Sequence, residues 1–404
     1  MSICSFINYP SALKAQGWFQ QNSGYSNNLS SVYFVNNMTG WAVGNSIIIA
    51  TTNGGLNWTV QGSNGLNSVY FANVMTGWAV GAGIIATTNG GLNWFTQRGW
   101  GPNESLSSVY FVNALTGWVV GYWSPFELIM ATLKTTNGGS NWIAQGLGGS
   151  ADGLSSVYFA DSMSGWAAGW VGSLGTIIAT TNGGLNWSSQ FVAGNVLSSV
   201  YFTDLLNGWA VGQNGTIRTT TNGGLNWSLQ ISGTSSLWSV YFVNSSAGWT
   251  VGENGTIKAT TNGGLNWSLQ TSGTNNWLTS VSFVDSVTGW AVGWNGIILK
   301  TTNGGITALN SYKNETPKVY KLFQNYPNPF NPVTEIKYES PIEEYISIKI
   351  YDILGNELRK LVNEKKSAGY YSITFDGTNY ASGIYFYTIE AGTYKDSKRL
   401  VLIK

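Results

Sequence analysis

A short motif occurs seven times in this sequence, and the repetition constrains the fold more than any other feature. The Gly-Trp pair of the motif Gly-Trp-x-x-Gly recurs with its tryptophan at Trp41, Trp78, Trp118, Trp166, Trp209, Trp249 and Trp290. Successive tryptophans are 37 to 48 residues apart. A period of about 40 residues is typical of the four-stranded blades of a β-propeller. We therefore predict an all-β fold with a seven-bladed β-propeller.

Each repeat contains four short segments that suit β-strands. In the sixth repeat they are SVYF, GWTVG, GTIKATT and LNWSLQ, separated by turns rich in Gly and Asn. The 52 Gly, 20 Trp and 21 Tyr of the chain, beside only 9% charged residues, fit short strands joined by tight turns. We number these segments as the first to fourth strands of a blade.

The last repeat lacks its fourth strand. Six repeats continue from TTNGG into a tryptophan, but the seventh reads TTNGGITAL from Thr301. The missing segment occurs at the other end of the repeat region, where GWFQQNSG (17–24) matches NWSLQTSG (266–273). We predict that the N-terminal strand completes the last blade, because this pairing closes the ring and removes a free sheet edge.

The repeats resemble two known sequence patterns. TTNGGLNW (260–267) is similar to the Asp-box of sialidase-like repeats, with Asn262 where Asp is commoner. This box is a turn that shapes the fold and has no catalytic role. The longer unit FVNSSAGWTVGENGTIKATTNGGLNW (242–267) resembles the repeat of photosystem II stability/assembly factors, and the resemblance covers residues 17–305. The propeller is accordingly assigned to residues 17–308.

The composition changes after Ala308. Residues 311–404 hold 13 of the 19 basic and 11 of the 18 acidic residues and contain no Trp. Alternating segments such as ISIKIYDI predict a small Ig-like β-sandwich. YKLFQNYPNPFNPVTEIKY (320–338) and the ending KRLVLIK are similar to the C-terminal sorting domain of type IX secretion. We place a linker at 309–318 and the sorting domain at 319–404, with a generic cell-surface sandwich as the alternative.

The resemblance to a sorting domain implies a secreted or cell-surface protein. Its residues 319–404 would be recognised by the type IX secretion machinery after passage through the inner membrane. That route needs a signal peptide, and MSICSFINYPSALKAQGW lacks its basic start and full apolar core, so we expect a leader upstream of Met1. No apolar run approaches the length of about 20 residues that spans a bilayer.

Composition excludes several classes of site. The chain has no His and a single Cys, so we expect no metal, no cofactor and no Ser-His-Asp triad. A net charge of +1 without a basic run gives no electrostatic basis for nucleic-acid binding. We expect a monomer.

Six tryptophans stand outside the repeated positions and form our candidate ligand site. They are Trp100, Trp123, Trp170, Trp238, Trp277 and Trp294. All fall in turns between the second and third strands or in connections between blades. In an up-and-down blade these two loop sets share one face, opposite the boxes. The longest insertions, 122–133 and 147–154, belong to the same loop sets.

Exposed indole rings on such a face can stack on sugar rings or clamp peptide side chains. A glycan or a peptide is therefore the expected ligand. The alternative is that these tryptophans fill gaps between loops.

We predict a binding, recognition or scaffold protein rather than an enzyme. A sialidase needs an arginine cluster, and the propeller holds only Arg98 and Arg218. The alternative is a secreted glycoside hydrolase, which uses two carboxylates about 5 to 10 Å apart. The loops of the ligand face offer four carboxylates for that role, namely Glu104, Glu127, Asp152 and Glu253.

Overall fold

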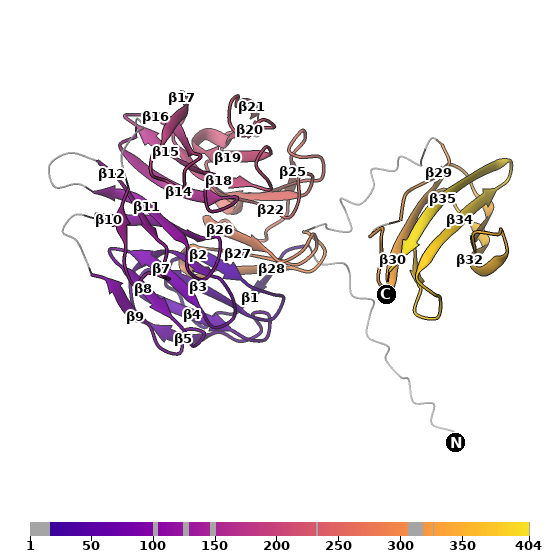
Figure 1. Cartoon of the computed structure of the whole chain (residues 1–404), viewed down its shortest axis with the longest axis horizontal. Coiled ribbons are helices and arrows are strands. Elements are labelled where there is room, and N and C mark those ends of the chain that lie inside the picture. Colours follow the sequence, from indigo (N-terminus) through magenta and orange to yellow (C-terminus); the bar gives the residue numbers. More distant parts are fainter. Residues whose placement is uncertain are drawn as a thin grey trace, which may run out of the picture. The chain divides into compact units, whose positions relative to one another are not determined.

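The protein is described by a computed structural model that places residues 17–99, 104–123, 129–145, 151–231, 233–305, 317, 319–325 and 327–403. The chain divides into two compact units, residues 1–309 and 310–404. Both consist of β-strands (Figure 1), and the helical turns among the described residues are three single 3-10 turns. The predicted all-β class is thus confirmed.

Within the described residues the first unit forms seven four-stranded antiparallel sheets, which we call blades 1 to 7. Blade 1 consists of β2 (Leu29–Phe34), β3 (Gly40–Gly44), β4 (Ile47–Thr51) and β5 (Thr59–Gly62). Blade 2 consists of β6 (Leu66–Phe71), β7 (Gly77–Gly81), β8 (Ile84–Thr87) and β9 (Phe95–Arg98). Blade 3 consists of β10 (Glu104–Phe111), β11 (Gly117–Trp123), β12 (Ile129–Thr135) and β13 (Ile143–Ala144).

Blade 4 consists of β14 (Gly153–Phe159), β15 (Gly165–Val171), β16 (Leu174–Thr180) and β17 (Ser188–Val192). Blade 5 consists of β18 (Leu197–Phe202), β19 (Gly208–Gly212), β20 (Thr216–Thr220) and β21 (Ser228–Ile231). Blade 6 consists of β22 (Leu237–Phe242), β23 (Gly248–Gly252), β24 (Ile257–Thr260) and β25 (Ser268–Gln270). Blade 7 combines both ends of the unit: β26 (Leu278–Phe283), β27 (Gly289–Gly293), β28 (Ile298–Thr301) and β1 (Phe19–Gln21). The first strands of successive blades contact one another, and β2 contacts β26, so the blades close a ring around a central axis.

Aromatic stacking joins each blade to the next. The second-strand tryptophan of one blade lies flat on the last residue of the next blade's first strand, as Trp249 does on Phe283 at 3.6 Å between ring centroids. The same pairing closes the ring, where Trp290 stacks on Phe34 at 3.5 Å. In blade 7, Trp18 packs edge-on against Phe283, which is the place of the box tryptophan in the other blades. The glycine before each second-strand tryptophan is needed here, because a Cβ at Gly289 would overlap the ring of Phe283.

Serine hydroxyls accept hydrogen bonds from backbone N–H groups of the innermost strands. The first strand of each blade is a sheet edge, and its free backbone N–H groups would be costly if buried without partners. The serine of one blade accepts a hydrogen bond from the valine N–H of the next, as Ser31 Oγ does from Val69 at 3.3 Å. Seven such bonds run around the ring, and Val32 to Ser280 at 3.2 Å links the last blade to the first.

The fourth strands begin later than the sequence pattern suggested. We expected LNWSLQ to form a strand from Leu265, but β25 starts at Ser268. The reason is the box turn, in which Asn262 Oδ1 accepts a hydrogen bond from the Asn266 N–H at 3.0 Å. Thr260 Oγ1 accepts from Gly264 N at 2.9 Å in the same turn, so the chain up to Trp267 belongs to the turn.

The second unit is a sandwich of two antiparallel sheets. One sheet has the order β29 (Lys321–Leu322), β30 (Val333–Ser340), β33 (Gly369–Asp376), and the other β32 (Glu357–Lys366), β31 (Glu344–Tyr351), β34 (Gly383–Ala391), β35 (Tyr394–Leu402). Ile336 and Phe375 of the first sheet share one core with Ile348 and Tyr387 of the second. Buried residues alternate with exposed ones along these strands, as the period-2 pattern requires.

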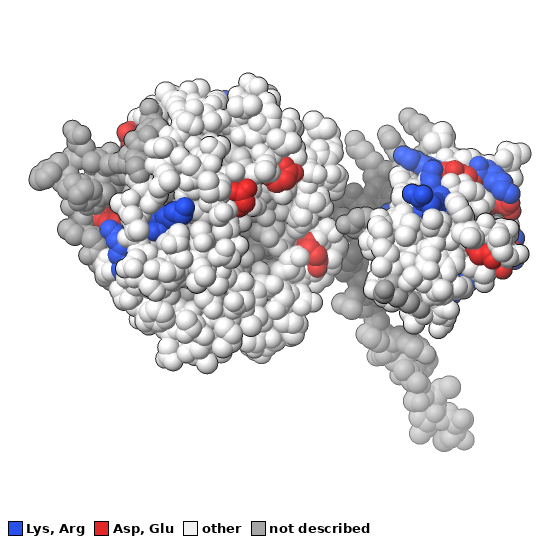
Figure 2. Space-filling view, in the orientation of Figure 1, with Lys and Arg blue, Asp and Glu red and all other residues white. Residues whose placement is uncertain are grey.

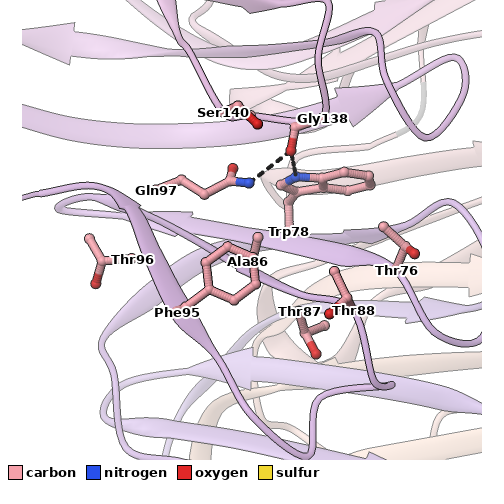
Figure 3. A pocket seen from close by; sticks show the side chains of 11 residues that line it. Thr76, Trp78, Ala86, Thr87, Thr88, Phe95, Thr96, Gln97, Gly138 and Ser140 are labelled. Atoms are coloured by element: carbon pink, nitrogen blue, oxygen red, sulfur yellow. Dashed lines mark hydrogen bonds between the residues drawn. The ribbon is translucent and has the colours of Figure 1, made fainter.

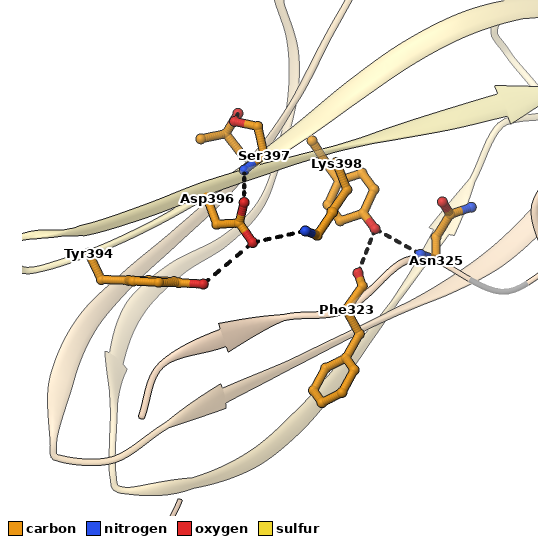
Figure 4. A network of polar contacts seen from close by, with 8 residues as sticks. Phe323, Asn325, Tyr394, Asp396, Ser397 and Lys398 are labelled. Atoms are coloured by element: carbon orange, nitrogen blue, oxygen red, sulfur yellow. Dashed lines mark hydrogen bonds and ion pairs between the residues drawn. The ribbon is translucent and has the colours of Figure 1, made fainter. Parts of the chain in front are cut away.

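A polar network fixes the start of this sandwich (Figure 4). The Tyr387 hydroxyl donates to the Phe323 carbonyl at 2.6 Å and accepts from the Asn325 N–H at 2.7 Å. The Asn325 side chain donates to Thr334 Oγ1 at 3.0 Å. Burial raises the pKa of Tyr387 to about 12.

Candidate functional site

The propeller has two faces that differ in regularity. One face, the box face, carries the box turns and the turns between first and second strands, which are joined by hydrogen bonds such as Gly54 N to Met38 O at 2.7 Å. The other, the loop face, carries the turns between second and third strands and the connections between blades. Of the candidate tryptophans, the described Trp123, Trp170, Trp238, Trp277 and Trp294 belong to the loop face.

Three of the candidate tryptophans form a stacked group on blades 6 and 7, which we call the indole stack. The rings of Trp238 and Trp277 lie 6.0 Å apart at an interplanar angle of 26°. The rings of Trp277 and Trp294 lie 4.4 Å apart at 30°. The sequence predicted that these residues share a face, and the structure brings them into direct contact.

Backbone geometry holds the outer end of the indole stack. Trp294 begins a single 3-10 turn (Trp294–Gly296), and its N–H donates to the Trp277 carbonyl at 2.9 Å. Asn295 adopts the left-handed conformation (φ 58°), which Asn tolerates better than most residues. Its side chain donates to Asn276 Oδ1 at 3.1 Å, and its N–H donates to Asn28 Oδ1 at 2.9 Å. Amide groups therefore lie beside the stack.

Exposure distinguishes the two ends of the indole stack. Trp294 is 41% exposed, whereas Trp238 is only partly exposed. The Trp238 Nε1 atom is buried without a hydrogen-bond partner among the described residues. A buried unpaired donor costs about 1–3 kcal/mol, which Ser198 at the same place in blade 5 avoids. Four box tryptophans, Trp58, Trp94, Trp187 and Trp227, share this unpaired Nε1, so the feature alone does not separate a ligand site from packing between loops.

The remaining candidate residues do not join the indole stack. Trp170, in blade 4, packs edge-on against Tyr122 of blade 3 at 5.8 Å, so it forms a second, smaller aromatic cluster. The backbone of Trp123 pairs with Glu104 and Ile129, and its side chain lies outside the described part of the structure. Trp100 lies outside the described residues. Tyr122 was not predicted, although its place beside Trp123 in the long insertion was visible.

The described carboxylates of the loop face are engaged in structural contacts. Glu104 forms an ion pair with Arg98 at 2.7 Å, and its side chain is only 6% exposed. Asp152 accepts a hydrogen bond from Gly172 N at 2.6 Å, and Glu253 accepts one from Ser236 N at 3.1 Å. Glu127 lies outside the described residues.

The central axis holds a cavity of about 200 Å³ lined by first-strand residues. Six blades contribute a tyrosine, and neighbouring rings lie 4.8 to 5.2 Å apart, as in Tyr33 and Tyr70. Burial raises the pKa of these tyrosines. Blade 7 has Ser282 at this position. The repeated SVYF segment, altered to SVSF only in the last repeat, carries the signal for this ring in the sequence.

Two pockets open between blades on the box face. One, of about 370 Å³, lies where the Trp78 Nε1 and the Gln97 side chain both donate to the Gly138 carbonyl (Figure 3). The other, of about 520 Å³, lies beside the equivalent bond from Trp166 to Gly223. The tryptophan-to-glycine bond at each pocket recurs around the ring, so both pockets follow the blade architecture, although Phe95 and Ser140 of the first pocket differ from their counterparts in other repeats.

The two units differ in how many charged side chains they carry. On the face in Figure 2 the propeller shows few charged side chains, whereas Lys, Arg, Asp and Glu gather on the visible face of the second unit. Among the described residues no cluster of three or more His, Cys, Asp or Glu is arranged to hold a metal ion. In that same part of the chain no helix is long and apolar enough to cross a membrane.

Residues 324–404 match the model of a secretion system C-terminal sorting domain. The second unit is a type IX secretion sorting domain. The protein that carries it is secreted or located at the cell surface, as the sequence predicted. The interaction of this domain with the secretion machinery follows from the same match.

The propeller resembles a second family. Residues 228–311 match the model of the photosynthesis system II assembly factor YCF48. A solved structure described as YCF48 bound to D1 peptide has a TM-score of 0.57 and 20% identity, covering 72% of this chain and 99% of that one. YCF48 from Cyanidioschyzon merolae gives 0.56 and 20%, covering 70% and 98%. The propeller therefore carries repeats of this type, which confirms the predicted resemblance.

A third solved structure is PorZ, an essential bacterial surface component of the type-IX secretion system of Porphyromonas gingivalis. Its TM-score is 0.50 at 13% identity, covering 98% of this chain and 61% of PorZ. No curated protein sequence matches the chain. At these identities the solved structures establish the fold alone.

Proposed function

We propose that the propeller is a recognition module, carried out of the cell by the sorting domain, that binds an uncharged carbohydrate through the indole stack. The observation that carries this proposal is the 41% exposed ring of Trp294 at the end of three stacked indoles. The same position holds Gln213 in blade 5 and Glu253 in blade 6. The aromatic surface is thus a departure from the repeat.

The chemistry around the indole stack suits a sugar. An indole face offers a large apolar surface on which the C–H face of a sugar ring can stack. The amides of Asn276 and Asn295 lie beside it and can exchange hydrogen bonds with hydroxyl groups. Few charged residues occur in the propeller sequence, and few appear on the propeller face in Figure 2, which favours a neutral ligand.

A peptide ligand is the second candidate. It is favoured by the structural likeness to YCF48, whose solved complex contains the D1 peptide. An apolar or aromatic peptide side chain would also fit against the exposed ring of Trp294.

Hydrolysis is a weaker proposal than binding. Glu104 is buried in its ion pair with Arg98, and both Asp152 and Glu253 hold backbone N–H groups. A general acid or nucleophile must reach the scissile bond, and these contacts fix the carboxylates in structural roles.

A glycan array probed with the full chain tests the proposal. We expect specific binding that Trp294→Gln removes, because the variant copies the residue of blade 5 and should fold normally. The matched control is Leu265→Ala on the box face, which removes a side chain that is 78% exposed and should leave binding unchanged.

Binding that survives Trp294→Gln would refute the assignment to the indole stack. If no glycan binds, a peptide array with the same three proteins decides whether the second candidate takes its place.

A further inference from the structure

The sorting domain has four outer strands, and they differ in how their edges are protected. An outer strand presents a row of unpaired N–H and C=O groups that can pair with another chain. The four are β29 and β33 in one sheet and β32 and β35 in the other. Comparing them shows which edge is open to a partner.

The edge of β35 is covered by the chain itself. Phe330 N donates to the Val401 carbonyl at 2.9 Å, and Ile403 N donates to the Phe330 carbonyl at 3.0 Å. Asn328 Oδ1 accepts from Val401 N at 2.9 Å. The segment before β30 thus runs along the C-terminal end of the last strand and occupies the free groups there.

The edges of β32 and β29 are protected in other ways. Six of the ten residues of β32 are charged, and charged side chains on an edge discourage pairing with a second strand. β29 is only two residues long and offers little to pair with.

The β33 edge has none of these three protections. Its sequence, GYYSITFD, is eight residues long, and only the terminal Asp376 is charged. Ile373 and Phe375 turn their side chains into the core, while Ser372 and Thr374 are exposed. The exposed side chains in the middle of this strand, Ser372 and Thr374, are therefore small and neutral.

Backbone hydrogen bonds of β30 alternate between its two neighbouring strands, and this alternation shows which backbone groups of β33 face outward. Phe323 N donates to the Lys337 carbonyl, so the backbone N–H and C=O groups of Lys337 point toward β29. The backbone groups of the adjacent residues, Ile336 and Tyr338, therefore point toward β33. Ile336 pairs with Ile373 in the β30–β33 register. Ile373 is therefore bonded within the sheet, and the N–H groups of Ser372 and Thr374 point away from β30.

We propose that the secretion machinery adds an extended strand to the β33 edge of the sorting domain. The match to the sorting-domain family establishes that an export partner exists. An extended backbone is the ligand that satisfies alternating N–H and C=O groups, and in strand addition the backbone bonds supply most of the affinity. The neutral side chains of Ser372 and Thr374 neither repel such a strand nor demand a charged one. This inference does not depend on the ligand of the propeller.

Proline substitution tests the edge without breaking the sheet. The test protein is the full chain, expressed behind a Sec leader in a bacterium that has type IX secretion. Proline is tolerated on an edge strand where its missing N–H faces solvent, so Thr374→Pro and Ser372→Pro should keep the β30 ladder. We expect at least a tenfold loss of protein at the surface and in the medium, with accumulation in the periplasm. The matched control Thr374→Ala keeps the N–H and should be exported normally.

Normal export of both proline variants would overturn the proposal. If either unfolds, as judged by hydrogen exchange of the β30 and β33 amides, Thr374→Lys decides, because it keeps the backbone and adds a charge that discourages strand addition. Normal export of that folded variant would also overturn it. A wild-type chain that sediments as a dimer, with Thr374→Pro monomeric, would assign the edge to a second copy of the protein and contradict the proposed partner.

Discussion

The propeller and the sorting domain satisfy their strand edges in opposite ways. In the propeller, one neutral serine per blade accepts the free N–H of the next blade, and the same solution recurs around the ring. In the sorting domain each edge has its own solution: a covering segment, a row of charges, a short strand, or none. Repetition lets a single residue type solve the problem for every blade, whereas a non-repeating sandwich must solve it strand by strand.

This difference also shows where function can be sought. In a repeating unit, a site that recurs in every blade belongs to the fold, and the positions that depart from the repeat stand out. The indole stack is such a departure. In the sandwich no repeat exists for comparison, so the open edge was recognised from hydrogen-bond geometry.

The largest expected effect tests whether stacking holds the blades together. Trp249→Ala removes a buried ring that stacks on Phe283 and whose Nε1 donates to the Gly304 carbonyl at 3.0 Å. We expect a loss of about 3–5 kcal/mol in the free energy of unfolding. Tryptophan fluorescence during urea denaturation measures the propeller selectively, because the chain from 311 onward contains no Trp. A loss below about 1 kcal/mol would mean that the serine ring, not stacking, dominates blade cohesion.

The corresponding test in the sorting domain is Tyr387→Phe. Loss of the hydroxyl leaves the Phe323 carbonyl and the Asn325 N–H without their partner, which should cost about 1–3 kcal/mol. Hydrogen exchange of the sorting-domain peptides measures this cost while the propeller peptides serve as the internal control. Unchanged exchange protection would show that the network of Figure 4 is dispensable.

The same hydroxyl predicts an alkaline limit to stability. Burial raises the pKa of Tyr387 to about 12, above its ordinary value of about 10. Because the folded-state pKa is the higher one, this contribution is fully present below pH about 10 and is lost as the pH rises through about 12. Between these values the wild-type sorting domain should lose protection more steeply than Tyr387→Phe. Parallel pH profiles of the two proteins would contradict this assignment.

The sequence predicted the fold well and the site in part, for physical reasons. The Gly-Trp repeat predicted the all-β propeller class because each Gly makes room for a stacked Phe in every blade. The start of β25 was placed too early, because strand propensity does not reveal that Asn262 holds Asn266 in a turn. Trp238, Trp277 and Trp294 were placed on one face, but the contact between their rings depends on side-chain packing that spacing alone does not show.

The serine ring provides a smaller effect. Ser280→Ala removes the acceptor for Val32 N at the closure between blades 7 and 1, and Ser68→Ala removes the same acceptor for Val109 N between blades 2 and 3. Each should cost about 1 kcal/mol. If the junction between blades 7 and 1 is the weakest in the ring, Ser280→Ala will lower the free energy of unfolding by more than Ser68→Ala does. It will also raise the exchange rate of the β1 amides. Equal costs would show that the ring has no weaker joint at the place where the chain ends meet.

The smallest effect is expected for the charges that set the sorting domain apart. Lys395 and Glu390 form an exposed ion pair at 2.6 Å. Exposed pairs contribute about 0–1 kcal/mol, so Lys395→Met should change the free energy of unfolding by less than about 0.5 kcal/mol. A larger loss at low salt that disappears at high salt would mean that charge stabilises this sandwich as stacking does the propeller. The absence of that loss would leave edge protection and solubility as the reasons why so much charge is concentrated there.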